Sequence, residues 1–474
     1  MTAATLPARA VRERVERVPG WLKTGVGVLA LALLLWLVYG EGPIGYDTSY
    51  ALLWGDQLAH AHLPDYVALH APTPHPLANL VGLVLAPLGD GAVDGIAVVS
   101  TLCLAALGWT AGVLGRRVWS WPVGVLFAVV LLTRPLLVGQ ELIASIDIPY
   151  LALVLGAAAM VARKPDRGLP VLAVLGVAGL LRPEAWLLAG AYVRFLLPRS
   201  TRRRRAALIG AALVAPALWL IADAIVTGDA LYSLHQASAT ADRTGEAGGV
   251  TDTVVWAAKA TKGILHIPVA IVGFVGVALA LAFQRRRAAV PLILLGLGTA
   301  GFVVVGFAGL PLLIRYFFLT ATVLGLFVAA ALLGWRELES GRPARRWWAI
   351  LAAVLAVGLV ASLPYEVDRL RNQVDGANVA AARQDQMGAL VQRPAIKALL
   401  LRCRPLQTYA FRSRPYLVFL RRHDAAISIV ATKYLKPRDG LLLVRPADPT
   451  MTVPAGFVPV ARDGAWTLLR RGCA

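Results

Sequence analysis

Charged residues are scarce in this chain. Only 16% of its 474 residues are Asp, Glu, Lys or Arg, while 58% are hydrophobic. The mean hydropathy is +0.66. A soluble domain of this size rarely has so little charge. The composition therefore argues against an ordinary soluble globular protein and favours a chain embedded in a membrane.

Acidic residues are scarcer than basic ones, with 27 Asp and Glu against 47 Lys and Arg, which gives a formal net charge of +20. In a soluble protein this excess would indicate nucleic-acid binding. Here the basic residues form short clusters between apolar segments and in the C-terminal tail. Such clusters fit membrane topology and anionic lipid headgroups better. We therefore expect membrane lipids, and no nucleic acid, among the partners.

Cysteine is also rare, with three residues in the chain. Cys103 lies in an apolar segment and is expected to be a buried thiol. Cys403 and Cys473 lie in the polar tail, where they pair if the tail is outside the cytoplasm; two free thiols are an equal alternative. The basic start of the chain leads into an apolar segment without a small-residue cleavage site, so we expect a retained first helix.

Long apolar runs recur along the chain, and a helix of roughly 20 residues crosses about 30 Å of hydrocarbon. They predict an all-α polytopic membrane protein with about 11 transmembrane helices. The short pair 168–181 and 185–197 is either two half-buried helices or one span kinked at Pro183. The predicted spans are 21–39, 92–114, 119–136, 148–162, 168–181, 185–197, 206–226, 264–283, 288–308, 311–334 and 347–363.

The basic clusters all fall on one side of these spans, which we assign to the cytoplasm. Between Lys23 and Arg116 there is no Lys or Arg, so residues 40–91 are predicted to be an outer loop. An odd number of spans places the tail outside as well. The expected organisation is a basic cytoplasmic N-terminus (1–20), a membrane domain (21–364) and an extracytoplasmic domain (365–474).

The tail differs in pattern from the spans. Residues 375–402 are polar and helical in pattern, and Pro415 begins a second predicted helix that ends at Arg422. Short alternating runs predict a small α/β domain, in which Asp463–Gly464 is typical of a type I′ hairpin turn. The predicted strands are 406–411, 425–431, 440–444, 457–461 and 465–469.

The first outer loop carries the strongest candidate for chemistry. Asp47 follows the first span closely, and a carboxylate there is able to accept a proton from a nucleophile; an ordinary solvated loop acid is the alternative. Tyr46, Tyr50 and Trp54 are spaced by four residues and share one helical face. That face would contact a sugar or lipid, or would only anchor the chain at the membrane interface.

The same loop ends at His75-Pro76, after which residues 77–89 form an apolar amphipathic stretch too short to span. We expect a helix lying at the membrane interface. His60 and His62, with Asp47 or Asp65, are a possible site for a divalent metal, although histidines at a wet interface are more often unliganded. The loop also contains His70.

Further ionisable residues lie at the outer ends of spans. Glu141 and Asp147 are at the start of the span at 148–162, where Asp147 is also a good helix cap. Arg182-Pro183-Glu184, Arg315-Tyr316 and Arg134 are placed similarly. Such groups are costly in a membrane and often functional. The three arginines are suited to clamping a phosphate, and the alternative is contact with lipid headgroups.

The third outer loop, 227–263, is polar. It contains Asp229, Tyr232, His235 and Glu246, and we expect it to order over a substrate.

Taken in order, these motifs resemble the GT-C superfamily of polytopic glycosyltransferases, which includes protein O-mannosyltransferases and aminoarabinose transferases. The similarity covers roughly residues 20–335. It implies a polyprenyl-phosphate sugar donor, Asp47 as catalytic base and contact between Arg315 and the donor phosphate. The O-mannosyltransferases have adjacent Asp-Glu where this chain has Asp47-Thr48, which argues against their type of protein acceptor.

The predicted function is transfer of a sugar, with inversion, to a cell-envelope glycan or lipid acceptor at the non-cytoplasmic face. A phosphate leaving group calls for cations where charge develops. A transporter is the rival class, but its polar sites would gather at the midplane and its halves would repeat; an inactive scaffold with this fold is the third possibility. We assign substrate contacts to Asp147, Glu141, His75, Arg182, Glu184, Arg315, Tyr316, Tyr46 and Tyr50, and assign no metal ligand.

Overall fold

The computed structural model describes residues 19–68, 71–244, 249–424, 428–431, 436–448, 451 and 453–473. The basic start of the chain, His70 and Glu246 lie outside these residues. The helices are α2 (Gly20–Tyr39), α3 (Tyr46–Ala59), α4 (Pro76–Leu85), α5 (Ala92–Val118), α6 (Trp121–Leu132), α7 (Pro135–Leu142), α8 (Asp147–Arg163), α9 (Leu169–Gly179), α10 (Glu184–Leu196), α11 (Arg202–Thr227), α12 (Tyr232–Thr244), α13 (Val250–Leu265), α14 (Ile267–Phe283), α15 (Ala289–Phe307), α16 (Phe318–Leu333), α17 (Pro343–Gln392), α18 (Pro394–Arg402) and α19 (Arg414–Leu420). Short 3-10 turns are η1 (Ala86–Gly91), η2 (Leu197–Arg199), η3 (Ile314–Phe317), η4 (Gly334–Glu337) and η5 (Phe411–Ser413).

The protein is a multi-pass membrane protein. Among the described residues, six helices are long and apolar enough to cross a membrane, or up to eight if each bent pair is one span. Each of the eleven predicted segments does contain a helix, but the count of eleven spans is not confirmed. Breaks shorten several segments: α6 and α7 meet at 63° at Thr133–Arg134, and α13 and α14 meet at 106° at His266.

One helix forms the centre of the bundle. Every residue of α16 from Phe318 to Ala331 is buried, as expected for a helix that is apolar all round. Gly276 of α14 lies directly against the Phe327 carbonyl, where a larger side chain would clash. Small residues of this kind let membrane helices approach closely. By contrast, α2 and α11 are mostly unburied, so their apolar side chains face lipid.

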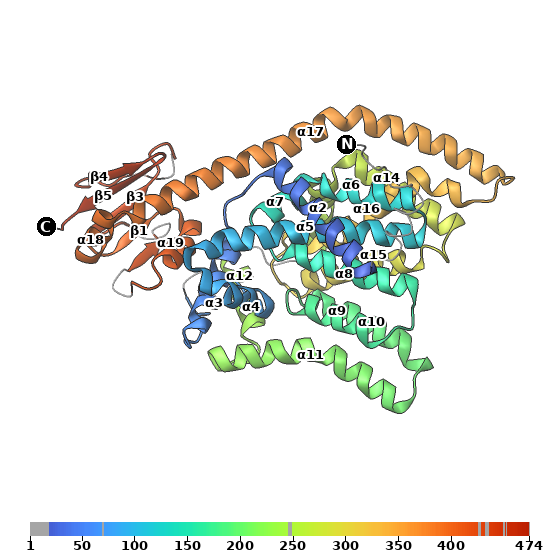
Figure 1. The fold of residues 1–474 in the computed structure, drawn as a ribbon, viewed down its shortest axis with the longest axis horizontal. Coiled ribbons are helices and arrows are strands. Elements are labelled where there is room, and N and C mark those ends of the chain that lie inside the picture. Colours follow the sequence, from blue (N-terminus) through green and yellow to red (C-terminus); the bar gives the residue numbers. More distant parts are fainter. Residues whose placement is uncertain are drawn as a thin grey trace, which may run out of the picture.

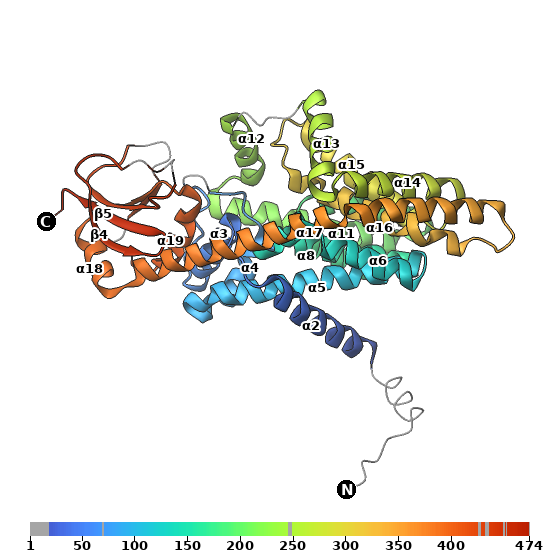
Figure 2. The same cartoon turned by 90° about the horizontal axis from the view of Figure 1, so that it is seen from above.

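The predicted interfacial helix at 77–89 corresponds to α4 followed by the 3-10 turn η1. The third outer loop is largely helical, because it contains α12 and α13. These two helices project from one side of the bundle in Figure 2.

The long helix α17 connects the bundle to the C-terminal domain (Figure 1). It has 50 residues and is about 75 Å long at 1.5 Å per residue. It passes through Pro364 without ending, so the domain boundary drawn after residue 364 falls inside a continuous helix.

The C-terminal domain contains a five-stranded sheet in the order β2-β1-β3-β5-β4. Strand β1 (Leu406–Thr408) is parallel to β2 (Ile429–Ala431) and β3 (Gly440–Val444); β5 (Trp466–Arg471) is antiparallel to β3 and to β4 (Val458–Asp463). A small C-terminal sheet was therefore predicted correctly, although β1 is shorter than expected. The helix predicted to begin at Pro415 is α19. Cys403 and Cys473 form a disulfide, with their Cα atoms 5.4 Å apart.

The predicted hairpin is confirmed, but its turn is one residue later than expected. Asp463 pairs with Trp466, so the two turn residues are Gly464 and Ala465. Gly464 has a φ of 49°, and Ala465 is not among the residues with positive φ. Glycine with positive φ at the first turn position is the pattern of a type II′ turn, not of type I′.

Candidate functional site

The site centres on an ion pair between Asp47 and Arg315. Asp47 lies in the first turn of α3, and Arg315 lies in η3, just before the central helix α16. The Arg315 Nη1 and Asp47 Oδ2 atoms are 2.7 Å apart. Both side chains keep about a third of their exposure, at 32% and 30%. The pair is therefore formed but still accessible.

The position of Asp47 is fixed by its neighbours in sequence. The Gly45 amide donates to the Ile143 carbonyl at 3.0 Å, and the Thr48 hydroxyl donates to the Ala144 carbonyl at 2.9 Å. Gly45 also has no room for a Cβ against the Ile143 carbonyl. The start of α3 is thus held against the turn between α7 and α8.

A second, buried charge cluster surrounds Arg182. Its guanidinium forms ion pairs with Asp147 and with Glu184, the latter at 2.6 Å between Nη2 and Oε1. The Ser145 hydroxyl donates to the second oxygen of Asp147 at 2.9 Å. Asp147 is 1% exposed. Such a buried charge requires this complete set of partners.

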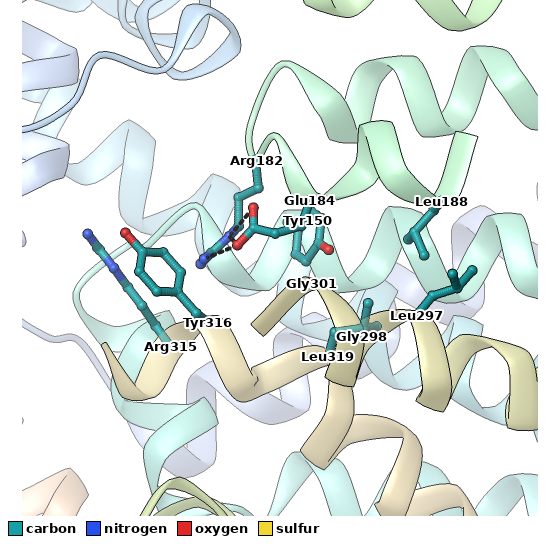
Figure 3. A pocket seen from close by; sticks show the side chains of 10 residues that line it. All are labelled: Tyr150, Arg182, Glu184, Leu188, Leu297, Gly298, Gly301, Arg315, Tyr316 and Leu319. Atoms are coloured by element: carbon teal, nitrogen blue, oxygen red, sulfur yellow. Dashed lines mark hydrogen bonds and ion pairs between the residues drawn. The ribbon is translucent and has the colours of Figure 1, made fainter. Parts of the chain in front are cut away.

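Tyr316 lies between the two arginines (Figure 3). Its ring centroid is 4.9 Å from the Arg182 guanidinium carbon and 5.9 Å from that of Arg315. The Tyr150 ring contacts Arg182 from another side at 5.6 Å. These contacts are in the range of cation–π interactions, and they separate two like charges by an aromatic face. The resulting arginine pocket is lined by Tyr150, Arg182, Glu184, Leu188, Leu297, Gly298, Gly301, Arg315, Tyr316 and Leu319.

His75, which lies at the N-cap position of α4 without making a side-chain capping bond, belongs to the same electrostatic network. Burial lowers the pKa of His75 to about 4, although the Asp47 carboxylate acts in the opposite direction. His75 is therefore neutral at pH 7. Its Nδ1 atom is buried without a hydrogen-bond partner among the described residues. Its ring packs edge-on against Trp219, with centroids 5.6 Å apart.

The electrostatics keep Asp47 ionised. Burial favours its neutral form, but the Arg315 guanidinium outweighs burial and holds the pKa of Asp47 below its ordinary value. Neutral pH therefore leaves a carboxylate that can accept a hydrogen bond or a proton. Arg412 of the C-terminal domain also lowers this pKa.

A chamber of about 300 Å³ opens on the other side of Asp47, which we name the apolar chamber. It lies between α3, α4, α5 and α8, and shares no lining residue with the arginine pocket. The Asp47–Arg315 pair joins the two, because Asp47 lines the chamber and Arg315 lines the pocket. The chamber is lined mainly by apolar side chains, with Asp47, His75, Asn79, Ser100 and Ser145 among its polar ones.

The structure thus brings together seven of the ten residues singled out from the sequence. Asp47, His75, Asp147, Arg182, Glu184, Arg315 and Tyr316 form one connected network.

Three predicted contact residues lie elsewhere. Glu141 is 5% exposed and accepts a hydrogen bond from the Thr101 hydroxyl at 2.6 Å, between α7 and α5. Tyr46 packs against Phe411 of the C-terminal domain, with ring centroids 6.1 Å apart. Tyr50 is 1% exposed, and its hydroxyl accepts from Arg414 at 3.1 Å. The aromatic face of α3 therefore packs against the C-terminal domain.

Of the three arginines expected to clamp a phosphate, Arg182 and Arg315 lie together and Arg134 does not. Arg134 points into a separate cluster, where it pairs with Glu366 at 3.0 Å beside His266. His60 packs edge-on against His423, with ring centroids 5.1 Å apart. Within the described ranges, no group of three or more His, Cys, Asp or Glu residues is placed to hold a metal.

Sequence reasoning missed Tyr150, Asn79 and Arg412. Tyr150 follows Asp147 by three residues, and this helical spacing placed it beside the same arginine. The pair Gly298 and Gly301 marks where α15 borders the arginine pocket. Arg412 had no local signal, because a contact 365 positions away from Asp47 depends on the fold.

No protein-family model matches this chain. No curated protein matches it either. Among solved structures, it is similar to ArnT from Cupriavidus metallidurans bound to undecaprenyl phosphate, with a TM-score of 0.54, 16% identity, and coverage of 95% of this chain and 98% of that one. The apo oligosaccharyltransferase from Archaeoglobus fulgidus gives a TM-score of 0.49 at 10% identity, over 86% of this chain and 64% of that one. The likeness to ArnT shows that the chain has the fold of that structure, in agreement with the GT-C-like fold expected from the sequence.

Proposed function

We propose that this protein is a membrane glycosyltransferase that moves a sugar from a polyprenyl-phosphate donor to an acceptor at the non-cytoplasmic face. The observation that carries the proposal is the Asp47–Arg315 pair, formed where an apolar chamber meets a pocket with two arginines. A base and a phosphate-binding cation therefore lie within one ion-pair distance of each other. That is the arrangement that displacement of a phosphate from an anomeric carbon requires.

In the proposed reaction, the acceptor hydroxyl oxygen attacks the anomeric carbon of the donor sugar. The new carbon–oxygen bond forms as the bond to the lipid phosphate breaks, and the phosphate leaves with the electron pair. Asp47 accepts the hydroxyl proton, and Arg315, beside Arg182, stabilises the charge that develops on the phosphate. A single displacement of this kind inverts the configuration of the anomeric carbon.

Two further observations support the proposed orientation. The Cys403–Cys473 disulfide suits an oxidising compartment outside the cytoplasm. Arg117, Arg286 and Arg287 line one cavity, and Arg163, Arg167 and Arg204 line another. Cytoplasmic loops are the ones enriched in such residues.

The test is the variant Asp47→Asn in a strain that lacks the native protein. Deletion should remove one sugar from one envelope glycan or glycolipid, as measured by mass spectrometry. The native protein should restore that sugar, and Asp47→Asn should not, because an amide cannot accept the proton. Loss of a proton acceptor typically costs about 10²–10⁴-fold in rate.

The matched control is Asp65→Asn in the same loop, whose side chain is exposed. It should restore the sugar fully. Full restoration by Asp47→Asn, at equal protein level, would refute the role of base. A product that retains the donor's anomeric configuration would refute the single displacement.

A further inference from the structure

The apolar chamber has the wrong electrostatics for the donor. Among the described residues that line it there is no Lys or Arg, and its one charged group is the Asp47 carboxylate. His75 adds no charge at neutral pH, since burial lowers its pKa to about 4. A lipid phosphate placed here would face the Asp47 carboxylate, whose partner cation Arg315 does not line the chamber.

The polar atoms of the chamber instead suit a ligand that donates hydrogen bonds. Asn79 is 2% exposed, and its Oδ1 atom is buried without a partner among the described residues, while its amide nitrogen donates to Tyr66 at 2.8 Å. The Nδ1 atom of His75 is buried and unpartnered as well. A buried polar atom without a hydrogen-bond partner lowers the stability of the fold. A ligand with a hydroxyl or amine group would supply the missing hydrogen bonds to these two atoms.

Most of the remaining lining is apolar. Leu52, Leu77, Val81, Val99 and Leu153 face the chamber together with other small and aliphatic side chains. Its volume of about 300 Å³ is at the lower end of the range of ligand pockets, roughly 300–1,000 Å³. A sugar alone would leave this apolar surface without a partner, whereas a hydrocarbon chain would cover it.

A second cavity, next to the arginine pocket, is available for the lipid chain of the donor. Leu188 and Leu297 line both the arginine pocket and a groove of about 740 Å³ between α8, α9, α10 and α15. The groove is mainly apolar, but it is also lined by Arg117, Arg286 and Arg287, the arginines assigned above to the cytoplasmic side. The arginine pocket has a free volume of only about 10 Å³, so a phosphate at Arg182 and Arg315 requires their side chains to move apart. Its prenyl chain would then extend into this groove. Two apolar cavities thus approach the Asp47–Arg315 pair, one from the carboxylate side and one from the arginine side.

We propose that the apolar chamber binds the hydrocarbon chain of the acceptor, so that the acceptor is a neutral, hydroxyl-bearing lipid or lipid-linked glycan. This inference rests on the proposed transferase function. The acceptor hydroxyl lies at Asp47, neighbouring hydroxyls donate to Asn79 and His75, and the chain occupies the space between α4, α5 and α8. A peptide or a free polysaccharide would leave the chamber unfilled.

Cys103 provides a native probe of this chamber. It lines the chamber, and it is the one unpaired thiol of the chain's three cysteines. The purified protein in lipid nanodiscs is treated with N-ethylmaleimide, and the rate of Cys103 alkylation is followed by mass spectrometry. The probes are dodecyl glucoside, as a neutral hydroxylated amphiphile, and undecaprenyl phosphate.

Dodecyl glucoside at ten times its Kd should slow alkylation about elevenfold, because the free fraction of the site is 1/(1 + [L]/Kd). Undecaprenyl phosphate should leave the rate unchanged, because it binds on the arginine side. Ala106→Trp, which fills the chamber, should abolish binding of dodecyl glucoside and keep that of undecaprenyl phosphate, measured by calorimetry. Val98→Trp is the control, since Val98 lies on the same helix, is 48% exposed and does not line the chamber.

Protection by undecaprenyl phosphate, or by neither probe, would overturn the proposal. Loss of both binding activities in Ala106→Trp would count against two separate sites. These measurements require no sugar transfer. They therefore remain informative if the proposed transferase function fails, and failure of protection alone leaves that function standing.

Discussion

At the residue scale, the balance of charge in the site is unusual. Two arginines, Arg182 and Arg315, face three carboxylates: Asp47, Asp147 and Glu184. With His75 neutral, the network carries an excess of negative charge before any donor binds. An anionic donor therefore needs a further cation, and the one that acts on Asp47 from outside the bundle is Arg412.

Arg412→Ala should weaken donor binding. Removing this guanidinium raises the pKa of Asp47 toward its ordinary value and removes an attraction for the donor phosphate. The KM for donor should rise severalfold, with kcat little changed, in a transfer assay at low salt. Arg402→Ala, another exposed arginine of the C-terminal domain, should behave as the native protein. If both variants raised the KM for the donor equally, Arg412 would act only through the net positive charge of the domain and not through its position near Asp47.

His75 predicts the pH dependence of stability. Its pKa is about 4 in the folded state and about 6.5 when unfolded, so between these values the unfolded state binds a proton that the folded state does not. The free energy of unfolding should therefore fall as the pH drops from 6.5 to 4, by up to about 3 kcal/mol. The contribution of Asp47 has the same direction, but its depressed pKa places the loss at lower pH.

The measurement is denaturant unfolding in detergent across that pH range, compared with His75→Asn. The variant lacks the titrating ring, so its curve should be flatter between pH 4 and 6.5. Parallel curves for the two proteins would show that His75 is not held neutral by burial.

Most of these residues could be recognised from the sequence, and the reason is physical. An ionisable group at the end of a span is conspicuous, because the surrounding sequence is apolar. Asp47, Arg182 and Arg315 were recognised in this way. Because all three were predicted to lie on the same side of the membrane, they were expected to lie near one another. Glu141 was equally conspicuous, but its carboxylate accepts a hydrogen bond from Thr101 between two helices. The sequence pattern alone does not distinguish such a buried structural carboxylate from a residue of the site.

At the element scale, α3 is the part of the fold that sequence described incompletely. Its helical spacing and aromatic face were evident, but the partner of that face was not. Phe419 of α19 packs in the same cluster as Tyr50 and Trp54. Arg422 pairs with Asp56 at 2.9 Å, and both side chains are largely buried, at 5% and 7% exposure. The helix that carries Asp47 is therefore held by the C-terminal domain.

Breaking this contact should disturb the site from a distance. Asp56→Asn leaves Arg422 with Asp90 as its remaining carboxylate, so the loss should be smaller than the cost of leaving a buried charge uncompensated, which is about 3–5 kcal/mol. We expect a lower thermal midpoint and reduced transfer, although Asp56 touches neither the arginine pocket nor the apolar chamber.

The double variant Asp56→Asn, Arg422→Gln should recover part of both losses, because it removes the buried Arg422 charge that Asp56→Asn leaves with one carboxylate fewer. Additive losses in this double-mutant cycle would mean that the two side chains act independently. In that case α3 would hold its position without the C-terminal domain.

At the scale of the whole molecule, hydropathy predicted a helical membrane bundle, while its count of eleven spans is not confirmed. Runs of apolar sequence do not reveal bends, and His266, with a φ of 67°, turns α13 and α14 into a pair at 106°. The long helix α17 joins the bundle to the C-terminal domain without a break. A change in composition at residue 364 predicted a boundary, whereas backbone hydrogen bonding continues to Gln392.

Topology is the last property that follows from the whole molecule. If the C-terminal domain is outside, its disulfide should be reducible in intact cells by an impermeant phosphine, after which Cys403 and Cys473 should react with an impermeant maleimide. Gly341→Cys tests the opposite end of α17, which is predicted to lie on the cytoplasmic side. Gly341 is exposed between η4 and α17, and its Cβ position meets no other atom within 4 Å. It should react only after the cells are permeabilised. The reverse pattern would place Asp47 on the cytoplasmic face, because α3 packs against the C-terminal domain. It would then exclude a donor supplied from the outer leaflet.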